Sequence, residues 1–276
     1  MRKKPPQHVI DRMVAIQDER AGGDPVDSLQ RESGKQSGPS NPHLAELIED
    51  GHIARVVRQV KSGKEATVYC CEAVATPALV AVKLYRDRIH RSFANDAIYN
   101  EGRWVGDART ERAVLAHSDF GRQYAFQSWV QSEFAALSAL HAAGASVPKP
   151  LAIVGSAIVM EYLGDEQRAA KPLRSAQVPD TELRRIADEL LRNVELFLRL
   201  HLVHGDLSAF NILWWESRTV VIDFPQAVDA RRNPHAEMLL KRDLANLARF
   251  FGPRSIEIDA DAIAADLWNR YRRAEL

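Results

Sequence analysis

The stretch that most constrains the fold of this chain is residues 202–224, LVHGDLSAFNILWWESRTVVIDF. It sets two acids and an amide, Asp206, Asn211 and Asp223, between short apolar runs that are typical of strands. The spacing lets a loop carry the first two residues while a short hairpin returns the third beside them. Mg²⁺ prefers hard oxygen ligands and keeps several waters, so one carboxylate, one amide and substrate phosphates suffice to bind it. The stretch therefore predicts a site for Mg²⁺ and a nucleotide phosphate, with the remaining carboxylate left to orient a hydroxyl nucleophile.

These polar residues also have simpler interpretations. Asp and Asn commonly form turns, but three of them at this spacing, each beside a predicted strand, favour a binding site over ordinary turns. A histidine two residues before a loop aspartate can act as a base or a metal ligand. We expect His204 instead to pack and hydrogen-bond so that it fixes the loop.

The composition is that of a globular protein. The 276 residues are 46% hydrophobic and 27% charged, and this length allows one large domain or two lobes. The formal net charge of zero gives no strong general signal for nucleic-acid binding. No run of eighteen apolar residues occurs and the first residues lack an apolar signal core, so we expect a cytoplasmic protein without a membrane span. Cys70 and Cys71 are adjacent in an apolar run, which favours buried thiols over a disulfide.

The first half of the chain predicts a small antiparallel sheet. Residues 1–42 are polar and rich in Gly, Ser, Pro and Gln, and we expect a disordered or loosely ordered arm there. A short helix is expected at residues 43–50. Three strands rich in β-branched residues are predicted at residues 53–60, 65–73 and 79–85. The turn SGKEAT between the first two is not a Walker A loop, because Arg58 stands where that motif needs Gly and Glu65 follows Lys64.

The rest of the chain predicts a second hairpin and then mostly helices. Residues 86–127 are highly charged, and Gly102, Gly106 and Gly121 are expected to restrict them to short helical pieces in a flexible insert. A strand hairpin about residues 155–156 leads into the connector EYLG. Helices are predicted at residues 128–143, 180–202 (with Asp180 as the capping candidate), 234–251 and 259–275.

We therefore predict a bilobal α+β domain at residues 43–276. Its N-lobe, an antiparallel sheet, covers about residues 53–160, the hinge covers 161–164, and the mainly helical, shortened C-lobe covers 165–276. Nucleotides favour a cleft between two such lobes. Lys83 on the third strand and Glu133 in the following helix would each be read alone as a surface residue. Beside the acids they meet a specific need, since a lysine that steers phosphates requires a carboxylate to hold its flexible stem.

The motifs carry a family resemblance. HGDLSAFNIL followed by VIDF resembles the catalytic loop and metal-binding segment of protein kinases, H-R-D-x-x-x-x-N and D-F-G. Two departures stand out, because Ser208 replaces a frequent Lys or Arg and Pro225 replaces the Gly of D-F-G. Together with SGKEATVY, IDFPQ and PHAEMLLKRD, these features resemble the RIO family of atypical kinases over about residues 53–251.

This resemblance implies ATP as the nucleotide, with Mg²⁺ or Mn²⁺. It implies that Asp206 is the catalytic acid, that Lys83 and Asn211 support it, and that Asn211 and Asp223 hold the metal. Met160 would flank the adenine as gatekeeper, and the backbone of the connector would hydrogen-bond the base. The implied nucleotide-binding residues are Ser62, Lys64, Val68, Lys83, Glu133, Met160, Glu161 and Leu163. Asp243 either braces the catalytic loop from the next helix or is a surface acid.

The implied activity is transfer of the γ-phosphoryl group of ATP to a serine of this chain or of an unknown protein. Slow ATPase turnover and phosphorylation of the metal-binding aspartate are also known in the family, so the nucleotide could instead drive a switch during ribosome small-subunit assembly, with Asp223 as both ligand and acceptor. A small-molecule phosphotransferase of the aminoglycoside or choline kinase type is the alternative, disfavoured by SGKEATVY and by the short C-terminal half. A non-catalytic nucleotide-binding scaffold is a third class, disfavoured by the joint presence of Lys83, Asp206, Asn211 and Asp223.

Overall fold

The computed structural model describes residues 41–74, 76–86, 97–100, 108–116 and 118–276. Nearly all of the predicted arm at residues 1–42 lies outside these ranges, as do Gly102 and Gly106 of the predicted insert. The domain boundaries proposed from the sequence therefore stay a prediction.

A five-stranded antiparallel sheet forms the first half of the described chain. The strands lie in the order β1-β2-β3-β5-β4. Their bounds are Arg55–Ser62 for β1, Ala66–Glu72 for β2, Leu79–Tyr85 for β3, Pro150–Val154 for β4 and Ala157–Glu161 for β5. The three early strands and the hairpin about residue 155 were predicted, and the structure confirms them, β3 at the predicted bounds.

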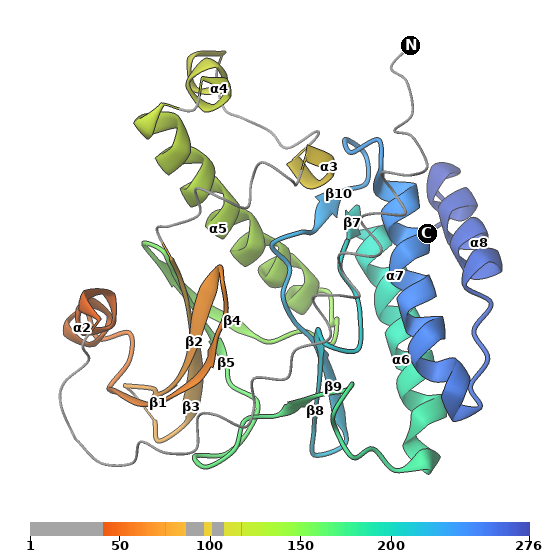
Figure 1. The fold of residues 1–276 in the computed structure, drawn as a ribbon, viewed down its shortest axis with the longest axis horizontal. Coiled ribbons are helices and arrows are strands. Elements are labelled where there is room, and N and C mark those ends of the chain that lie inside the picture. Colours follow the sequence, from red (N-terminus) through yellow and green to blue (C-terminus); the bar gives the residue numbers. More distant parts are fainter. Residues whose placement is uncertain (1–40, 75, 87–96, 101–107, 117) are drawn as a thin grey trace. The chain divides into compact units, whose positions relative to one another are not determined.

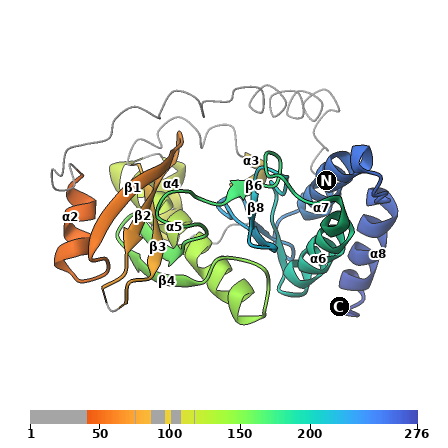
Figure 2. The same cartoon turned by 90° about the horizontal axis from the view of Figure 1, so that it is seen from below.

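Helices cover the two faces of this sheet (Figure 2). Helix α2, Pro42–Glu49, buries Leu44 and Leu47 in a cluster with Val80 and Val82 of β3. The opposite face of β3 belongs to the main core, with helix α5, Asp119–Ala142. Because side chains alternate along a strand, Lys83 faces the α5 side while its two neighbours face α2. Strand β3 is therefore buried on both faces, and the face toward α5 carries the lysine of the predicted site.

Helix α5 begins well before the predicted start at residue 128, and Gly121, expected to interrupt helices, lies in its first turn. The reason is a close approach between helices. A Cβ atom at Gly121 would lie 2.1 Å from the carbonyl oxygen of Ala113, in helix α4, Ala108–Leu115. A glycine is needed there for contact rather than for a break. Ser118 caps α5 by accepting a hydrogen bond from the Gly121 N–H.

The second half is mainly helical, as predicted, and α6, α7 and α8 run alongside one another (Figure 1). They span Asp180–Arg199, Ala236–Phe251 and Ala260–Arg272, and the turn Gly252–Arg254 follows α7. Asp180 was expected to cap α6, but Pro179 holds the N-cap position and Asp180 lies in the first turn, where its charge suits the helix dipole. Two small sheets belong to this half of the described chain. They pair β7 Leu202–Val203 with β10 Val228–Asp229, and β8 Ile212–Trp215 with both β6 Lys171–Pro172 and β9 Arg218–Val221.

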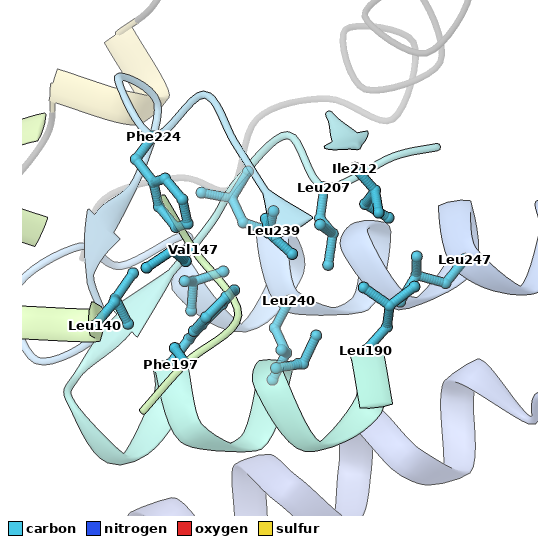
Figure 3. Close-up of a cluster of buried hydrophobic side chains, with 14 of the residues drawn as sticks. Leu140, Val147, Leu190, Phe197, Leu207, Ile212, Phe224, Leu239, Leu240 and Leu247 are labelled. Carbon is cyan, nitrogen blue, oxygen red and sulfur yellow. The ribbon is translucent and has the colours of Figure 1, made fainter. Parts of the chain in front are cut away.

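One hydrophobic cluster connects the sheet side to the helical side (Figure 3). Phe224, the residue after Asp223, points at Phe197 of α6 with ring centroids 5.7 Å apart. Leu140 of α5 and Val147 lie beside these rings, and all four side chains are at most 3% exposed. Burying Phe224 in this way fixes the backbone on which Asp223 is carried.

Candidate active site

The loop between β7 and β8 carries Asp206 and Asn211 and makes a tight turn at Gly205. Gly205 has φ +79°, a left-handed conformation that glycine adopts without strain. A Cβ atom here would lie 2.7 Å from the carbonyl oxygen of Gln226. The loop therefore lies directly against the segment that follows Asp223, which brings the two parts of the predicted motif together.

Asp243 of α7 holds this loop through its backbone N–H groups. Its carboxylate accepts hydrogen bonds from the N–H groups of Gly205 at 2.8 Å and Leu207 at 2.9 Å, and its side chain is almost fully buried. Burial raises the pKa of Asp243 to about 7, against the lowering effect of these two donors. Of the two interpretations left open by the sequence, the structure supports the brace and excludes the surface acid.

His204 fixes the loop from the other side, as predicted. Its Nε2 lies 3.1 Å from the carbonyl oxygen of Ile222, and its Nδ1 lies 3.2 Å from the N–H of Asp206. These contacts require a neutral ring that donates through Nε2 and accepts through Nδ1. Burial lowers the pKa of His204 to about 4, which keeps the ring neutral at physiological pH.

Asp206 and Asn211 are in contact within the loop. The amide nitrogen of Asn211 donates to the backbone oxygen of Asp206 at 2.9 Å and to its Oδ2 at 3.1 Å. The backbone oxygen of Asn211 accepts from the N–H of Ile222 at 2.9 Å. This last bond ties the loop to the residue just before Asp223, so the hairpin returns the second acid to the loop.

Asp223 forms an ion pair with Lys83, which also pairs with Glu133. The Lys83 Nζ lies 2.7 Å from Asp223 Oδ1 and 2.8 Å from Glu133 Oε1. Glu133 is 2% exposed and Lys83 12%, whereas the Asp223 side chain is 44% exposed. One lysine thus joins a buried carboxylate on α5 to an accessible one. Asp223 also has φ +73°, a left-handed conformation that aspartate adopts more readily than most residues with a side chain.

The charges of this group depend on one another. Burial alone would lower the pKa of Lys83, but the carboxylates of Asp223 and Glu133 outweigh it and raise that pKa. Burial opposes ionisation of Asp223, and the lysine more than compensates, so the pKa of Asp223 is lowered. For Glu133 burial wins over the lysine, and its pKa is raised. Lys83 and Asp223 are therefore charged at neutral pH.

The other predicted nucleotide residues lie on β1, β2 and the turn between them. Ser62 ends β1 and accepts a hydrogen bond from Arg86. Lys64 is exposed in the turn and takes no part in the ion pairs of Lys83. Val68 lies directly across from Lys83 in the β2–β3 register, so it belongs to the same face of the sheet.

The predicted hinge, residues 161–164, begins at the last residue of β5. Met160 is buried opposite Ala81 of β3. The carboxylate of Glu161 pairs with Arg218 at 3.0 Å, so its side chain is turned toward the helical half. The carbonyl oxygen of Leu163 accepts a hydrogen bond from the N–H of Ala170 at 2.9 Å.

Several residues that support the site were not found from the sequence. Trp129 donates from its indole nitrogen to the carbonyl oxygen of Pro225 at 3.1 Å, which holds the segment after Asp223. Asn246 donates to the carbonyl oxygen of Leu207 at 3.0 Å. Asn246 lies three residues after Asp243 on α7, on the same side of the helix, and that spacing was a usable signal. Trp129 lies four residues before Glu133 on α5, which also places the two on one side of their helix.

The donor set suits a hard divalent cation. Asp223 offers a partly exposed carboxylate, and the amide nitrogen of Asn211 is committed to Asp206, which leaves the amide oxygen of Asn211 to face a cation. Within the described ranges no group of three or more His, Cys, Asp and Glu side chains could hold a metal. A carboxylate and an amide that act together with substrate phosphates are what Mg²⁺ needs, and a closed protein cage is not.

Known proteins resemble this chain over most of its length. A family model described as "RIO domain" matches residues 67–263. A RIO-type serine/threonine-protein kinase Rio1 of Haloferax volcanii is 37% identical over 224 residues, covering 80% of this chain and 71% of that protein. The Rio1 kinase of Thermoplasma acidophilum is 30% identical over 69% of this chain and 94% of its own length. The serine/threonine-protein kinase RIO1 of Caenorhabditis elegans is 29% identical, and this chain spans 39% of it.

Proposed function

This chain belongs to the RIO domain family of atypical serine/threonine kinases, and we propose that it transfers the γ-phosphoryl group of ATP to a serine or threonine hydroxyl. The observation that supports this most strongly is the position of Lys83 between Glu133 and Asp223, beside the loop of Asp206 and Asn211. In this arrangement Lys83 would be the cation for the phosphates, Asn211 and Asp223 the ligands for a metal, and Asp206 the carboxylate for the acceptor.

Each residue has a distinct task in this proposal. Lys83, held by Glu133, binds the α- and β-phosphates, and Asp223 with Asn211 holds the divalent cation. A bound cation would neutralise charge on the β- and γ-phosphates. Asp206 orients the acceptor hydroxyl and takes its proton as the oxygen attacks the γ-phosphorus. The bond from that phosphorus to the β–γ bridging oxygen breaks, and ADP leaves with the electron pair.

The hinge supports adenine binding in the same proposal. Met160 and Val68 would contact the ring, and the connector backbone at Glu161 and Leu163 would hydrogen-bond it, while Ser62 and Lys64 would lie over the phosphates. The acceptor is a protein, either this chain or another. An association with a ribosomal particle follows from the family resemblance and stays a prediction. Within the described ranges, no helix is both long and apolar enough to cross a bilayer.

The test is incubation with γ-labelled ATP and Mg²⁺. We expect label on protein from the wild type and a loss of about 10²-fold or more in Asp206→Asn, the range measured when a general base is removed. Asp259→Asn is the matched control, because Asp259 caps α8 and Asn caps equally well. Label that enters an added aminoglycoside or amino alcohol instead of protein would favour the small-molecule phosphotransferase and refute the proposal.

A further inference from the structure

We propose that Tyr99 and Arg242 are positioning residues for Asp206, and that helix α3 is a strap that holds the catalytic loop in its working conformation. This inference rests on the proposed function, because it concerns the same loop. Tyr99 lies outside every motif that carries the kinase resemblance. Arg242 lies at the end of one of them, PHAEMLLKRD, directly before Asp243.

The first observation is that two side chains converge on one carbonyl group. The oxygen of Gly205 accepts hydrogen bonds from Arg242 Nη2 and, at 3.4 Å, from the hydroxyl of Tyr99. Arg242 also donates to the Tyr99 hydroxyl oxygen at 2.5 Å, with its guanidinium 5.7 Å from the centre of the Tyr99 ring. The three groups form a closed triangle on the peptide that links Gly205 to Asp206.

The same peptide region is held from its other side. Asp243 accepts from the N–H groups of Gly205 and Leu207, the residues on either side of Asp206. The carbonyl clamp of Tyr99 and Arg242 opposes this N–H clamp, so the backbone that carries the Asp206 side chain cannot rotate without breaking one of them. A catalytic carboxylate gains from such fixation because a small displacement of the reacting group lowers the rate strongly.

The second observation is where Tyr99 comes from. It lies on α3, Ala97–Asn100, in the connection between β3 and α5, far in sequence from the loop it contacts. Tyr99 is 5% exposed, and its ring would lie 3.3 Å from a Cβ atom at position 205. A second bond anchors α3, because the amide nitrogen of Asn233 donates to the carbonyl oxygen of Ile98 at 2.7 Å. The short helix is thus fastened both to the catalytic loop and to the segment before α7.

The third observation is that Arg242 is a costly residue to keep in this place. Its Nε is buried and has no hydrogen-bond partner among the residues that the structure describes. A buried donor without an acceptor is unfavourable, and an apolar residue would avoid the cost. The hydrogen bonds that Arg242 does make, to the Gly205 carbonyl and to the Tyr99 hydroxyl, offset this cost.

The test compares Tyr99→Phe and Arg242→Lys with two matched controls. Tyr271→Phe removes a hydroxyl on α8 that lies 2.9 Å from Nδ1 of His201. Arg254→Lys changes an arginine that donates to the Phe250 carbonyl and lies over the Phe250 ring. We expect kcat for phosphoryl transfer to fall about fivefold in Tyr99→Phe, the rate equivalent of one ordinary hydrogen bond, and further in Arg242→Lys. The Kd of ATP should stay close to the wild-type value, and the melting temperature of Tyr99→Phe should fall by only about 2–4 °C, the equivalent of one lost hydrogen bond. Both controls should keep wild-type kcat.

Hydrogen exchange provides a readout that does not depend on activity. In Tyr99→Phe, amide exchange should rise together in residues 97–100 and 204–207, and Tyr271→Phe should change neither segment. If kcat and exchange in both test variants match the controls, the positioning role is refuted. A fall in kcat accompanied by an equal loss of ATP affinity would also refute it, since that is general damage to the site. A wild type that transfers no phosphate would refute the proposed function, while the exchange experiment would still decide whether α3 holds the loop.

Discussion

The buried carboxylate of Asp243 gives the sharpest prediction about stability. Its folded-state pKa is raised to about 7 by burial, while an exposed aspartate titrates near pH 4. Between these values the folded protein binds a proton that the unfolded chain has released. Linkage then requires the stability due to Asp243 to be complete below about pH 4 and to be lost as pH rises toward 7.

The magnitude follows from the size of the shift. Each pKa unit is equivalent to about 1.4 kcal/mol, so the free energy of unfolding should lose about 3 kcal/mol through this group between pH 5 and pH 8. Asp243→Asn removes the titration. The variant also turns an amide nitrogen toward one of the two backbone donors, at Gly205 or Leu207, which leaves a buried N–H unpaired at a cost of about 1–3 kcal/mol. That cost does not depend on pH.

The assay is urea unfolding of both proteins at pH 5, 6, 7 and 8. The wild type minus Asp243→Asn difference in unfolding free energy should shrink by about 3 kcal/mol across the series. Buried neutral His204, with its pKa lowered to about 4, adds an opposite trend below pH 6.5, but both proteins share it and the difference removes it. Asp229→Asn is the control. The pKa of Asp229 is lowered in the folded protein, so this carboxylate is ionised in both the folded and the unfolded protein from pH 5 to 8. The difference in unfolding free energy between wild type and Asp229→Asn should therefore stay constant. A constant or growing difference for Asp243→Asn would refute the account of this brace.

Two further predictions concern packing and charge. Lys83→Met should leave the Glu133 carboxylate buried without its cation and lower the free energy of unfolding by about 3 kcal/mol. In a double-mutant cycle measured by urea unfolding, adding Glu133→Gln should restore part of that loss. Simple additivity of the two changes would contradict the ion pair. Gly121→Ala should destabilise the protein by about 2 kcal/mol or more, because the new methyl group collides with α4, whereas Gly252→Ala, whose Cβ atom meets nothing within 4 Å, should melt within about 2 °C of the wild type.

Local sequence signals predicted the elements that carry the site. The β-branched residues in 79–85 predicted β3, and the spacing from Asp206 to Asp223 predicted the loop and hairpin. The order of strands and helices predicted the bilobal α+β fold, the motifs added the resemblance to the RIO family, and the family comparison confirms that family. Glu133 lies fifty positions from Lys83, and no local pattern showed that α5 would bring the two together; only the need of a phosphate-binding lysine for a carboxylate suggested it.

The remaining features depend on tertiary contacts that leave no local signal. Tyr99 lies in a charged connection with no clear periodicity, and its partner carbonyl belongs to a loop more than a hundred residues later. Gly121 was read as a helix breaker because a sequence cannot show that another helix backbone passes over it. Asp180 has the chemistry of a cap, but the preceding proline takes that position. The catalytic, nucleotide and metal roles assigned to individual residues stay predictions.

The central claim is that the site transfers phosphate to a hydroxyl group, and the chemical stability of the labelled protein tests it most directly. After incubation with γ-labelled ATP and Mg²⁺, the denatured protein is treated with hydroxylamine, and the labelled residue is mapped by mass spectrometry. The account predicts label on serine or threonine that resists hydroxylamine and is absent in Asp206→Asn. Label that hydroxylamine removes, mapped to Asp223, would show an acyl phosphate and would contradict the claim in favour of an ATPase switch.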